Sequence, residues 1–350
     1  MSPRRRRKHS SSSREIPDRC DRIVFSTLMR PLHITTPLLP HDALSAALGK
    51  AVLLKVESLQ PSGSFKLRGI GRMCQRAVET GARQLICPSG GNAGFAAAVA
   101  GRALGVPTTI LVPQSTPESV RRQIAALGAV VVVHGTVWDE ANEEALRRCG
   151  AGEAAYVPPF DHPDIWDGNA TLIDEAVAQA ENGFDVVVCA VGGGGLMCGV
   201  LEGLHRNKLA HVPVIAVETE GAASLHAAVK AGKLVTLPAI TSIATTLGAK
   251  RVAQAAFDWT RRHPVHSVTV SDSQALDACL QFADDLRILV EPACGAALAV
   301  AYQGLEVLAP YRRPLLVVCG GIAVDMAKLV VWREEQASRR ALARDVPAGP

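Results

Sequence analysis

A lysine on a turn is the first residue whose position suggests covalent chemistry. Lys66 follows the apolar run 52–56, and the Pro-Ser-Gly segment 61–63 turns the chain just before it. An amine held between Phe65 and Leu67 is expected to be desolvated, which lowers its pKa and frees a nucleophile for Schiff-base chemistry. Taken alone, Lys66 is better interpreted as an ordinary surface lysine at the start of a helix, and only the motif as a whole favours the chemical role.

A second loop, Pro88-Ser-Gly-Gly-Asn-Ala-Gly94, lies between an apolar run and an alanine-rich segment. Its small residues let main-chain N–H groups approach a carboxylate or phosphate at a helix N-terminus, and Ser89 and Asn92 add side-chain donors. A tight turn with an ordinary N-cap is the alternative. We interpret the loop as a site for a substrate carboxylate.

Four consecutive glycines, 192–195, directly follow the apolar run 186–191. A backbone without Cβ atoms can form a nest of N–H donors around a phosphate dianion, assisted by the following helix. A close-packed turn is the other interpretation. The glycines do not follow the G-x-G-x-x-G spacing and no Lys-Ser/Thr pair succeeds them, which excludes a nucleotide P-loop and weakens a dinucleotide site.

Together these loops resemble the fold-type II pyridoxal-phosphate (PLP) enzymes, most closely the serine dehydratase branch that lacks a regulatory domain. The resemblance extends from about residue 31 to residue 329, and six ordered motifs carry it. They are Pro-Ser-Gly-Ser-Phe-Lys-Leu-Arg-Gly (61–69), Ser-Gly-Gly-Asn-Ala-Gly (89–94), Pro-Phe-Asp-His-Pro-Asp-Ile-Trp (159–166), Gly-Gly-Gly-Gly-Leu (192–196), Glu-Pro-Ala-Cys-Gly-Ala-Ala (291–297) and Val-Cys-Gly-Gly (318–321).

The resemblance implies a role for each motif position. Lys66 resembles the lysine that forms the Schiff base, Phe65 is expected to stack near the cofactor ring, and Asn92 to bond the cofactor 3-hydroxyl. The phosphate is expected to bind the main-chain N–H groups of Gly192, Gly193, Gly194, Gly195 and Leu196. The substrate carboxylate is expected to bind Ser89, Gly90, Asn92 and Ala93.

Cys319 occupies the family position that faces the pyridine nitrogen, where related threonine dehydratases usually have serine. A thiol is too weak an acid to keep the pyridine fully protonated, so the cofactor is a weaker electron sink. Concerted loss of a β-substituent is then favoured over transamination or racemisation. Without the resemblance, Cys319 would be interpreted as a buried thiol.

The resemblance also implies a potassium-like cation near the cofactor. Carboxylate, hydroxyl and carbonyl oxygens suit such a hard ion. The matching positions are Glu218, Ala222 and Ser224, with main-chain oxygens around Leu247 and Ala249. Glu218 taken alone is equally a surface acid at a strand end.

The implied reaction is β-elimination of L-serine and L-threonine to pyruvate or 2-oxobutyrate and ammonia. Two departures from the family pattern bear on it, because Ile322 and Ala323 stand where polar residues are usual and Pro88 replaces a common serine. The first removes hydrogen bonds near the pyridine edge, which predicts slow turnover or a shifted substrate preference. β-Replacement, racemisation or a binding protein without turnover remain alternatives on this fold, although the segments 159–166 and 291–297 favour elimination.

The elements that must position these loops alternate between short β-branched runs and longer amphipathic stretches, as in βα units around a mainly parallel sheet. Ligands in such folds bind at the carboxyl ends of strands. Strands are predicted at 52–56, 84–87, 108–112, 130–134, 186–191, 214–217 and 315–318. Helices are predicted at 68–80, 92–104, 117–127, 137–148, 164–181, 195–206, 223–231, 251–262, 271–284, 294–308 and 324–344.

The predicted architecture is an α/β fold of the tryptophan synthase β type, with two lobes that each hold a mostly parallel sheet flanked by helices. Residues 60–160 are expected to form a small lobe with the carboxylate loop, and residues 31–59 and 161–330 a large PLP-binding lobe. Residues 331–350 are expected to form a C-terminal helix and tail. Closure of the lobes over the site would exclude water.

The charge of the chain is concentrated at its N-terminus. The formal net charge is +4, but residues 1–30 hold nine Lys/Arg against three acids, so the remainder is nearly neutral, which argues against nucleic-acid binding. We interpret the Arg/Ser-rich head as a disordered tail, with a localisation or transit segment as the alternative.

The remaining composition describes a globular protein without a membrane segment. No uninterrupted apolar run approaches the roughly 20 residues that span a bilayer. The nine cysteines are scattered without a Cys-x-x-Cys pair, which predicts reduced thiols in a cytoplasmic protein rather than disulfides or zinc. The partners expected are a small amino-acid substrate and, by resemblance, a second copy of the chain in a homodimer.

Overall fold

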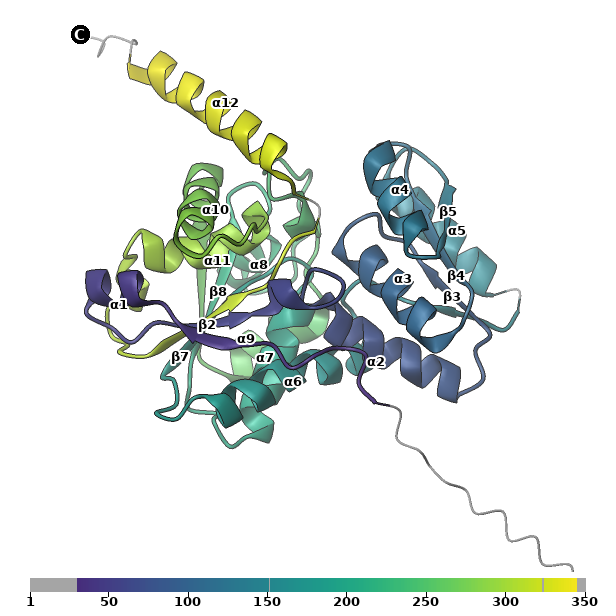
Figure 1. Cartoon of the computed structure of the whole chain (residues 1–350), viewed down its shortest axis with the longest axis horizontal. Helices are drawn as coiled ribbons and strands as arrows, with labels where there is room; N and C mark the ends of the chain where they lie inside the picture. Colours follow the sequence, from purple (N-terminus) through teal and green to yellow (C-terminus); the bar gives the residue numbers. More distant parts are fainter. Residues whose placement is uncertain (1–29, 151, 323, 345–350) are drawn as a thin grey trace, which may run out of the picture. The chain divides into compact units, whose positions relative to one another are not determined.

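The computed structural model describes residues 30–150, 152–322 and 324–344, without the side chains of 339–344. The basic head predicted for residues 1–30, except Arg30, and Ala323 therefore lie outside the described residues. From Pro31 onward the chain forms one compact unit that contains two β-sheets with helices around them (Figure 1). This arrangement confirms the predicted α/β fold class.

The larger sheet has the strand order β1-β2-β10-β7-β8-β9. β1 pairs antiparallel with β2, and all other neighbours pair in parallel. The central strands are buried along their whole length, as expected for a sheet covered on both faces. The strands are β1 (Leu38–Pro40), β2 (Leu53–Val56), β7 (Val186–Ala190), β8 (Val214–Thr219), β9 (Val265–Val270) and β10 (Pro314–Val318).

The smaller sheet has the order β5-β4-β3-β6, and all its strands are parallel. Its two central strands are β3 and β4, and β5 is an edge strand with Val130 and Val133 exposed. The strands are β3 (Gln84–Cys87), β4 (Thr108–Val112), β5 (Val130–Val133) and β6 (Ala154–Tyr156). The division of residues 31–350 into lobes at 60 and 160 stays a prediction.

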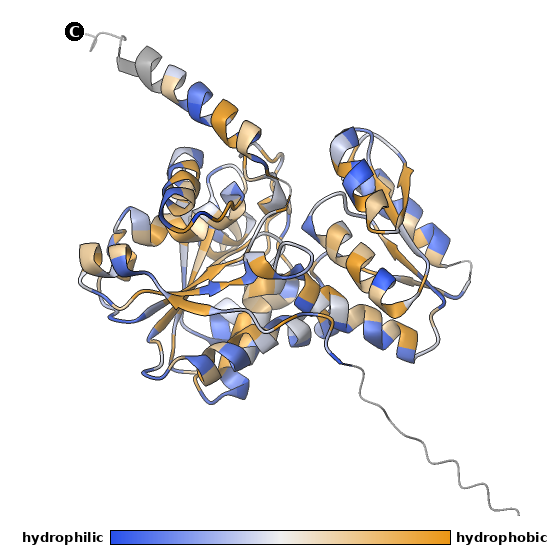
Figure 2. Cartoon of the chain, in the orientation of Figure 1, coloured by the Kyte–Doolittle hydropathy of each residue, from blue (hydrophilic) through white to orange (hydrophobic). Residues whose placement is uncertain are grey.

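The helices cover the sheets with their apolar faces, and Figure 2 shows hydrophobic residues gathered on the strands and on the helix sides that face them. No helix in the described ranges has the length and apolarity to cross a bilayer. The helices are α1 (Asp42–Leu48), α2 (Lys66–Glu79), α3 (Asn92–Leu104), α4 (Glu118–Ala126), α5 (Trp138–Cys149), α6 (Pro163–Gln179), α7 (Gly195–Arg206), α8 (Ser224–Ala231), α9 (Gln254–Arg262), α10 (Asp272–Leu286), α11 (Pro292–Tyr302) and α12 (Met326–Arg344). Short 3-10 helices lie at η1 (Glu57–Leu59), η2 (Thr245–Leu247) and η3 (Glu306–Leu308).

Several predicted boundaries shift in the structure. The helix predicted from residue 68 begins at Lys66, and the one predicted at 294–308 ends at Tyr302, because Gly304 has a positive φ of 56° that breaks the helix before η3. The short elements β1, β6 and α1, and the strand β9, were not predicted.

Helix α2 contacts helices around both sheets, because it packs against α3 and α6. Its first turn is fixed by Arg68, whose side chain is fully buried. Arg68 forms two hydrogen bonds of 2.6 and 2.7 Å to Glu57 and two of 2.7 Å to Glu175. Arginine–carboxylate pairs with two hydrogen bonds combine charge with fixed geometry. The network therefore fixes the position of the first residues of α2, including Lys66.

Candidate active site

The turn before Lys66 is bound to the end of strand β10. Ser64 forms an antiparallel bridge with Gly320, and the Phe65 N–H donates to the carbonyl of Cys319 at 3.0 Å. Gly320 adopts a φ of 111°, which favours glycine. Segments more than 250 residues apart therefore meet at the carboxyl edge of the larger sheet, which brings Lys66 and Cys319 together.

The Lys66 amine is bonded to the main chain and lies near an aromatic ring. Its Nζ donates to the Pro159 carbonyl at 2.5 Å and lies 5.3 Å from the centre of the Phe65 ring. Desolvation lowers the pKa of Lys66 to about 8, while the nearby Cys87, Cys319 and Glu291 act in the opposite direction. An amine with this pKa is partly neutral near pH 8 and can act as a nucleophile or a base.

Asn92 is the first residue of α3, and its side chain is buried. Its Nδ2 donates to the Glu291 carboxylate at 2.7 Å, and its Oδ1 accepts from the Ile322 N–H at 3.4 Å. The Ile322 side chain contacts Gly63, where an added Cβ would lie 2.9 Å from the Ile322 Cβ. Asn92 therefore links the carboxylate loop to the segments around Lys66.

The carboxylate loop before α3 is closely packed. A Cβ at Gly90 would lie 2.8 Å from Thr116, and one at Gly94 would lie 1.9 Å from the Ser89 carbonyl. The Ser89 hydroxyl accepts from the Gly91 N–H at 3.3 Å. The first N–H groups of a helix, here those of Asn92 and Ala93, have no acceptor within the helix. The loop can thus present main-chain donors to an anion.

The glycine loop connects β7 to α7 and lies at the same sheet edge as Cys319, because β7 and β10 are neighbouring parallel strands. A Cβ at Gly193 would lie 2.3 Å from the Phe160 ring, so packing alone already requires glycine there. Gly194 has a φ of 94° and precedes α7, whose first N–H groups, at Gly195 and Leu196, lack helical acceptors. These donors fit a phosphate.

Cys319 is a buried, neutral thiol. A hydrogen bond with the Cys294 side chain and burial raise the pKa of Cys319 well above its ordinary value. The eight cysteines within the described ranges are all free thiols, and only Cys149 is partly exposed. A neutral thiol next to Lys66 fits a weakly acidic partner for a pyridine nitrogen.

Three of the predicted cation positions, Glu218, Ala222 and Ser224, lie at or just before the N-terminus of α8. Glu218 accepts hydrogen bonds from the N–H groups of Leu225 (2.8 Å) and His226 (2.7 Å), and burial raises the pKa of Glu218 to about 7. The buried Ser224 hydroxyl has no partner among the described residues. Nor do those residues contain a group of three or more His, Cys, Asp or Glu that could hold a metal ion. The other positions are Ala222 and Leu247, both buried, and Ala249.

Glu291 is the main site residue to which the sequence assigned no role. It belongs to the motif 291–297, where a single acid precedes an apolar helix. Its Oε1 accepts from Asn92 and from Thr246, both at 2.7 Å, and burial raises its pKa to about 7. An isolated acid within the apolar run 290–301 was the signal that could have identified it.

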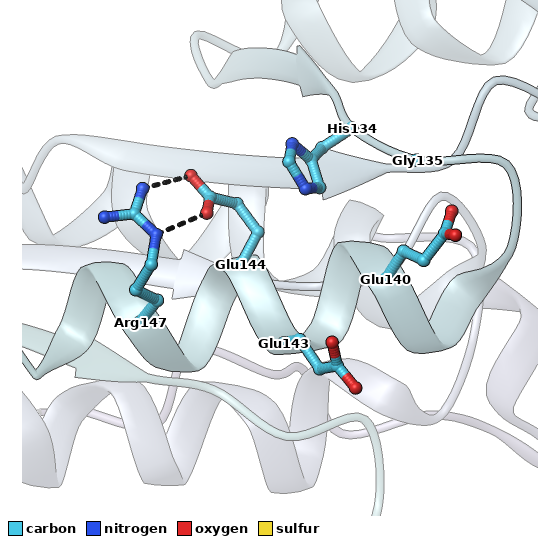
Figure 3. A pocket seen from close by; sticks show the side chains of 6 residues that line it. All are labelled: His134, Gly135, Glu140, Glu143, Glu144 and Arg147. Atoms are coloured by element: carbon cyan, nitrogen blue, oxygen red, sulfur yellow. Dashed lines mark hydrogen bonds and ion pairs between the residues drawn. The ribbon is translucent and has the colours of Figure 1, made fainter.

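A separate hollow on the smaller sheet's helix α5 carries no comparable chemistry (Figure 3). Glu144 is paired with Arg147 and Arg148, which lower the pKa of Glu144 to about 2. Glu140 accepts from the main chain at the start of α5. The carboxylates of Glu140 and Glu144 thus have structural partners. The hollow is lined by His134, Gly135, Glu140, Glu143, Glu144 and Arg147.

Known proteins resemble this chain over most of its length. Residues 29–320 match the family described as pyridoxal-phosphate dependent enzyme. A human protein named serine dehydratase-like is 49% identical over 307 residues, which is 85% of this chain and 93% of the relative. The Bos taurus L-serine dehydratase/L-threonine deaminase is 46% identical over 316 residues, 87% of this chain and 96% of the relative.

A solved structure agrees with these sequence matches. The fungal L-serine ammonia-lyase from Rhizomucor miehei has a TM-score of 0.82 and 38% identity, and the match covers 87% of this chain and 98% of that one. The lysine turn, the carboxylate loop and the glycine loop of this chain all lie within the matched family range. The chain therefore belongs to the pyridoxal-phosphate-dependent enzyme family, among the members named serine dehydratase.

Proposed function

We propose that this chain catalyses the β-elimination of L-serine to pyruvate and ammonia, and of L-threonine to 2-oxobutyrate and ammonia. The observation that carries the proposal is the position of Lys66, a desolvated amine with a pKa lowered to about 8 beside the neutral Cys319 thiol. The names of the similar proteins support the substrate class.

The site residues fit PLP by their donors and charge. When bound, PLP supplies an electron sink for loss of the Cα proton of an amino acid. Lys66 would hold it covalently, Phe65 would lie against its ring and Cys319 would face its pyridine nitrogen. Asn92 would bond its hydroxyl. Its phosphate would accept hydrogen bonds from the main chain of Gly192, Gly193, Gly194, Gly195 and Leu196.

The chain's own residues would then orient the substrate and move one proton. The substrate carboxylate would accept hydrogen bonds at the start of α3, where Asn92 is already fixed by Glu291. The Lys66 amine would remove the Cα proton, because a group with a pKa near the working pH transfers protons well. The carboxylate site proposed consists of Ser89, Gly90, Asn92 and Ala93.

The test is to incubate the purified chain with PLP, K⁺ and L-serine and to couple any pyruvate to NADH oxidation, with Lys66→Ala as the control. Pyruvate from the unaltered chain alone would support the proposal, and L-threonine would then establish the preference. Binding of PLP without pyruvate would contradict elimination and favour replacement chemistry, racemisation or a binding protein.

We also propose that a potassium-like cation binds near Glu218 and Ser224, with carbonyl oxygens of Leu247 and Ala249 and the main chain of Ala222. The unpartnered Ser224 hydroxyl beside the buried Glu218 carboxylate supports this. Activity is expected to be higher in KCl than in tetramethylammonium chloride at equal ionic strength. Equal rates in the two salts would contradict a cation site.

The location and assembly of the chain are further proposals. Free, mostly buried thiols support a reducing, cytoplasmic environment. The lobes proposed are residues 31–59 with 161–330, and residues 60–160, followed by the C-terminal segment 331–350. A homodimer is proposed from the family resemblance, and light scattering on the purified chain would test it through the molecular mass.

A further inference from the structure

Glu291 is a buried acid whose side chain does not cap its own helix. It stands at the N-cap of α11, yet its side chain forms no capping hydrogen bond there. Instead, Oε1 accepts from the Asn92 amide and from the Thr246 hydroxyl, each at 2.7 Å. The side chain is thus turned away from the first-turn N–H groups of α11, which an N-cap side chain can satisfy.

The backbone around Glu291 holds the side chain in place. Gly321 adopts a φ of 139°, and a Cβ there would lie 2.4 Å from the Glu291 Cγ. The Glu291 N–H donates to the Gly320 carbonyl at 3.4 Å. The strand end that carries Cys319 thus packs directly against the Glu291 side chain, which leaves little freedom to rotate.

The residues that Glu291 holds belong to different loops of the site. Asn92 begins the helix that follows the carboxylate loop. Thr246 precedes Leu247, whose Cα would lie 3.0 Å from a Cβ on Gly192 in the glycine loop. One carboxylate oxygen therefore connects the carboxylate loop with the neighbourhood of the glycine loop, while the rest of Glu291 packs against the segment that follows β10.

The second oxygen of Glu291 is not used structurally. Oε2 is buried and has no hydrogen-bond partner among the described residues. A buried polar atom left unpaired costs free energy, and its presence in a folded protein calls for an explanation. The charged and titratable groups that interact with Glu291 come from several elements. They are Lys66 on α2, Lys328 on α12, Cys279 on α10 and Cys319 after β10.

Glu291 and Lys66 influence each other electrostatically. Burial lowers the pKa of Lys66, and Glu291 opposes that decrease together with Cys87 and Cys319. Removing the Glu291 charge is therefore expected to leave a larger fraction of the Lys66 amine neutral at a given pH. An opposite charge nearby always favours the charged form of its partner.

We propose that Glu291 is a positioning residue of this site, which clamps Asn92 through one oxygen and stabilises the protonated amine of Lys66 with its charge. The proposal rests on the proposed function in that Lys66 and Asn92 are the groups that act on cofactor and substrate. Glu291 itself acts through them.

The charge effect is tested by the rate at which the apo form of the full chain captures PLP, followed by absorbance between pH 6 and pH 10. The rate of the unaltered chain should rise with a midpoint near pH 8, where the Lys66 pKa lies. Glu291→Gln should shift the midpoint to lower pH, because it removes one of the charges that favour the protonated amine. Glu202→Gln, which removes a half-buried carboxylate on α7, should leave it unchanged. An unshifted midpoint in Glu291→Gln would overturn the electrostatic part.

The clamp is tested by comparing Glu291→Gln with Glu291→Ala. The glutamine oxygen can still accept from Asn92 and Thr246, so the dissociation constant of L-serine should change less than about threefold. The alanine variant loses both hydrogen bonds and should bind L-serine roughly tenfold more weakly. Equal weakening in the two variants would overturn the clamp.

Failure of the proposed function has a different signature. If the unaltered chain captures PLP and shows both variant effects but forms no pyruvate, the elimination activity is wrong and the role of Glu291 stands. If pyruvate forms and neither variant effect is observed, the role of Glu291 is wrong and the activity stands.

Discussion

The Asn92 amide donates to the Glu291 carboxylate at 2.7 Å, although 199 residues separate them along the chain. Both side chains are buried, so this hydrogen bond ties the start of α3 to the start of α11 away from water. The acceptor is a carboxylate, so the hydrogen bond exists only while the side chain at position 92 can donate. A negative charge at position 92 should therefore disrupt the pair.

Asn92→Asp would place two carboxyl groups at hydrogen-bonding distance. One must then stay protonated, as in other carboxyl pairs, so the variant is expected to be destabilised by about 2 kcal/mol or more at pH 8 and by less at pH 5.5. Thermal unfolding at the two pH values measures this. Asn92→Ala loses the hydrogen bond that helps to keep the pKa of Glu291 down, but it adds no second carboxyl, so its loss of stability should depend on pH less than that of Asn92→Asp. Equal losses at both pH values for Asn92→Asp would contradict the interpretation.

Removing Arg68 should destabilise the fold strongly. Arg68→Met leaves Glu57 buried without its partner, and breaking a buried pair costs about 3 to 5 kcal/mol. The matched control is Arg72→Met on the same helix, because the Arg72–Asp167 pair is 41% and 46% exposed and should contribute less than about 1 kcal/mol. Urea denaturation of both variants gives the free energies of unfolding, and similar values would refute the proposed anchoring.

A side chain at Gly193 should disturb the glycine loop. The Cβ of Gly193→Ala would lie 2.3 Å from Phe160, and overpacking of this kind costs about 1 to 3 kcal/mol. If the loop binds the cofactor phosphate, the dissociation constant of PLP should rise about tenfold. Gly152→Ala, where the new Cβ meets no atom within 4 Å, is the control. Unchanged affinity in Gly193→Ala would argue against the phosphate site.

The stability of the apo chain should depend on Lys66 at alkaline pH. The folded pKa is lowered from 10.5 to about 8, so between pH 8 and pH 10.5 the unfolded chain binds more protons than the folded chain at this position. Stability contributed by this group therefore rises with pH over that window. Lys66→Met should remove this increase. The measurement is the difference between the melting temperatures of the unaltered chain and the variant, taken at pH 8 and at pH 10. A constant difference would show that Lys66 is not desolvated.

Replacing the Cys319 thiol with a hydroxyl should cost little pyruvate formation, whereas replacing it with a carboxyl should change the balance of reactions. Cys319→Ser keeps a neutral, weakly acidic group and is expected to retain pyruvate formation within about tenfold. Cys319→Asp offers a stronger acid and should increase side reactions at Cα relative to elimination. The ratio of D-serine to pyruvate formed from L-serine measures this, and an identical ratio in the two variants would contradict the assigned position of Cys319.

The sequence by itself determined the order of the βα units and the local character of the loops. The helices predicted at 92–104 and 195–206 agree with the structure to the residue, because each directly follows a glycine-containing strand-to-helix loop and Gly105 ends the first of them. The strands β1 and β6 have only three residues each, which is too short for a periodic pattern. Strand β9 was not predicted because its sequence includes His, Ser and Thr and has no continuous apolar run.

Only the tertiary structure decided how these loops meet. The bridge between Ser64 and Gly320 and the orientation of Glu291 toward Asn92 join segments that are far apart in the sequence. The pKa of Lys66 depends on desolvation by all the segments around it, which no local pattern encodes. Residue types and spacing therefore identified the lysine, whereas packing between distant segments set its charge and its partners.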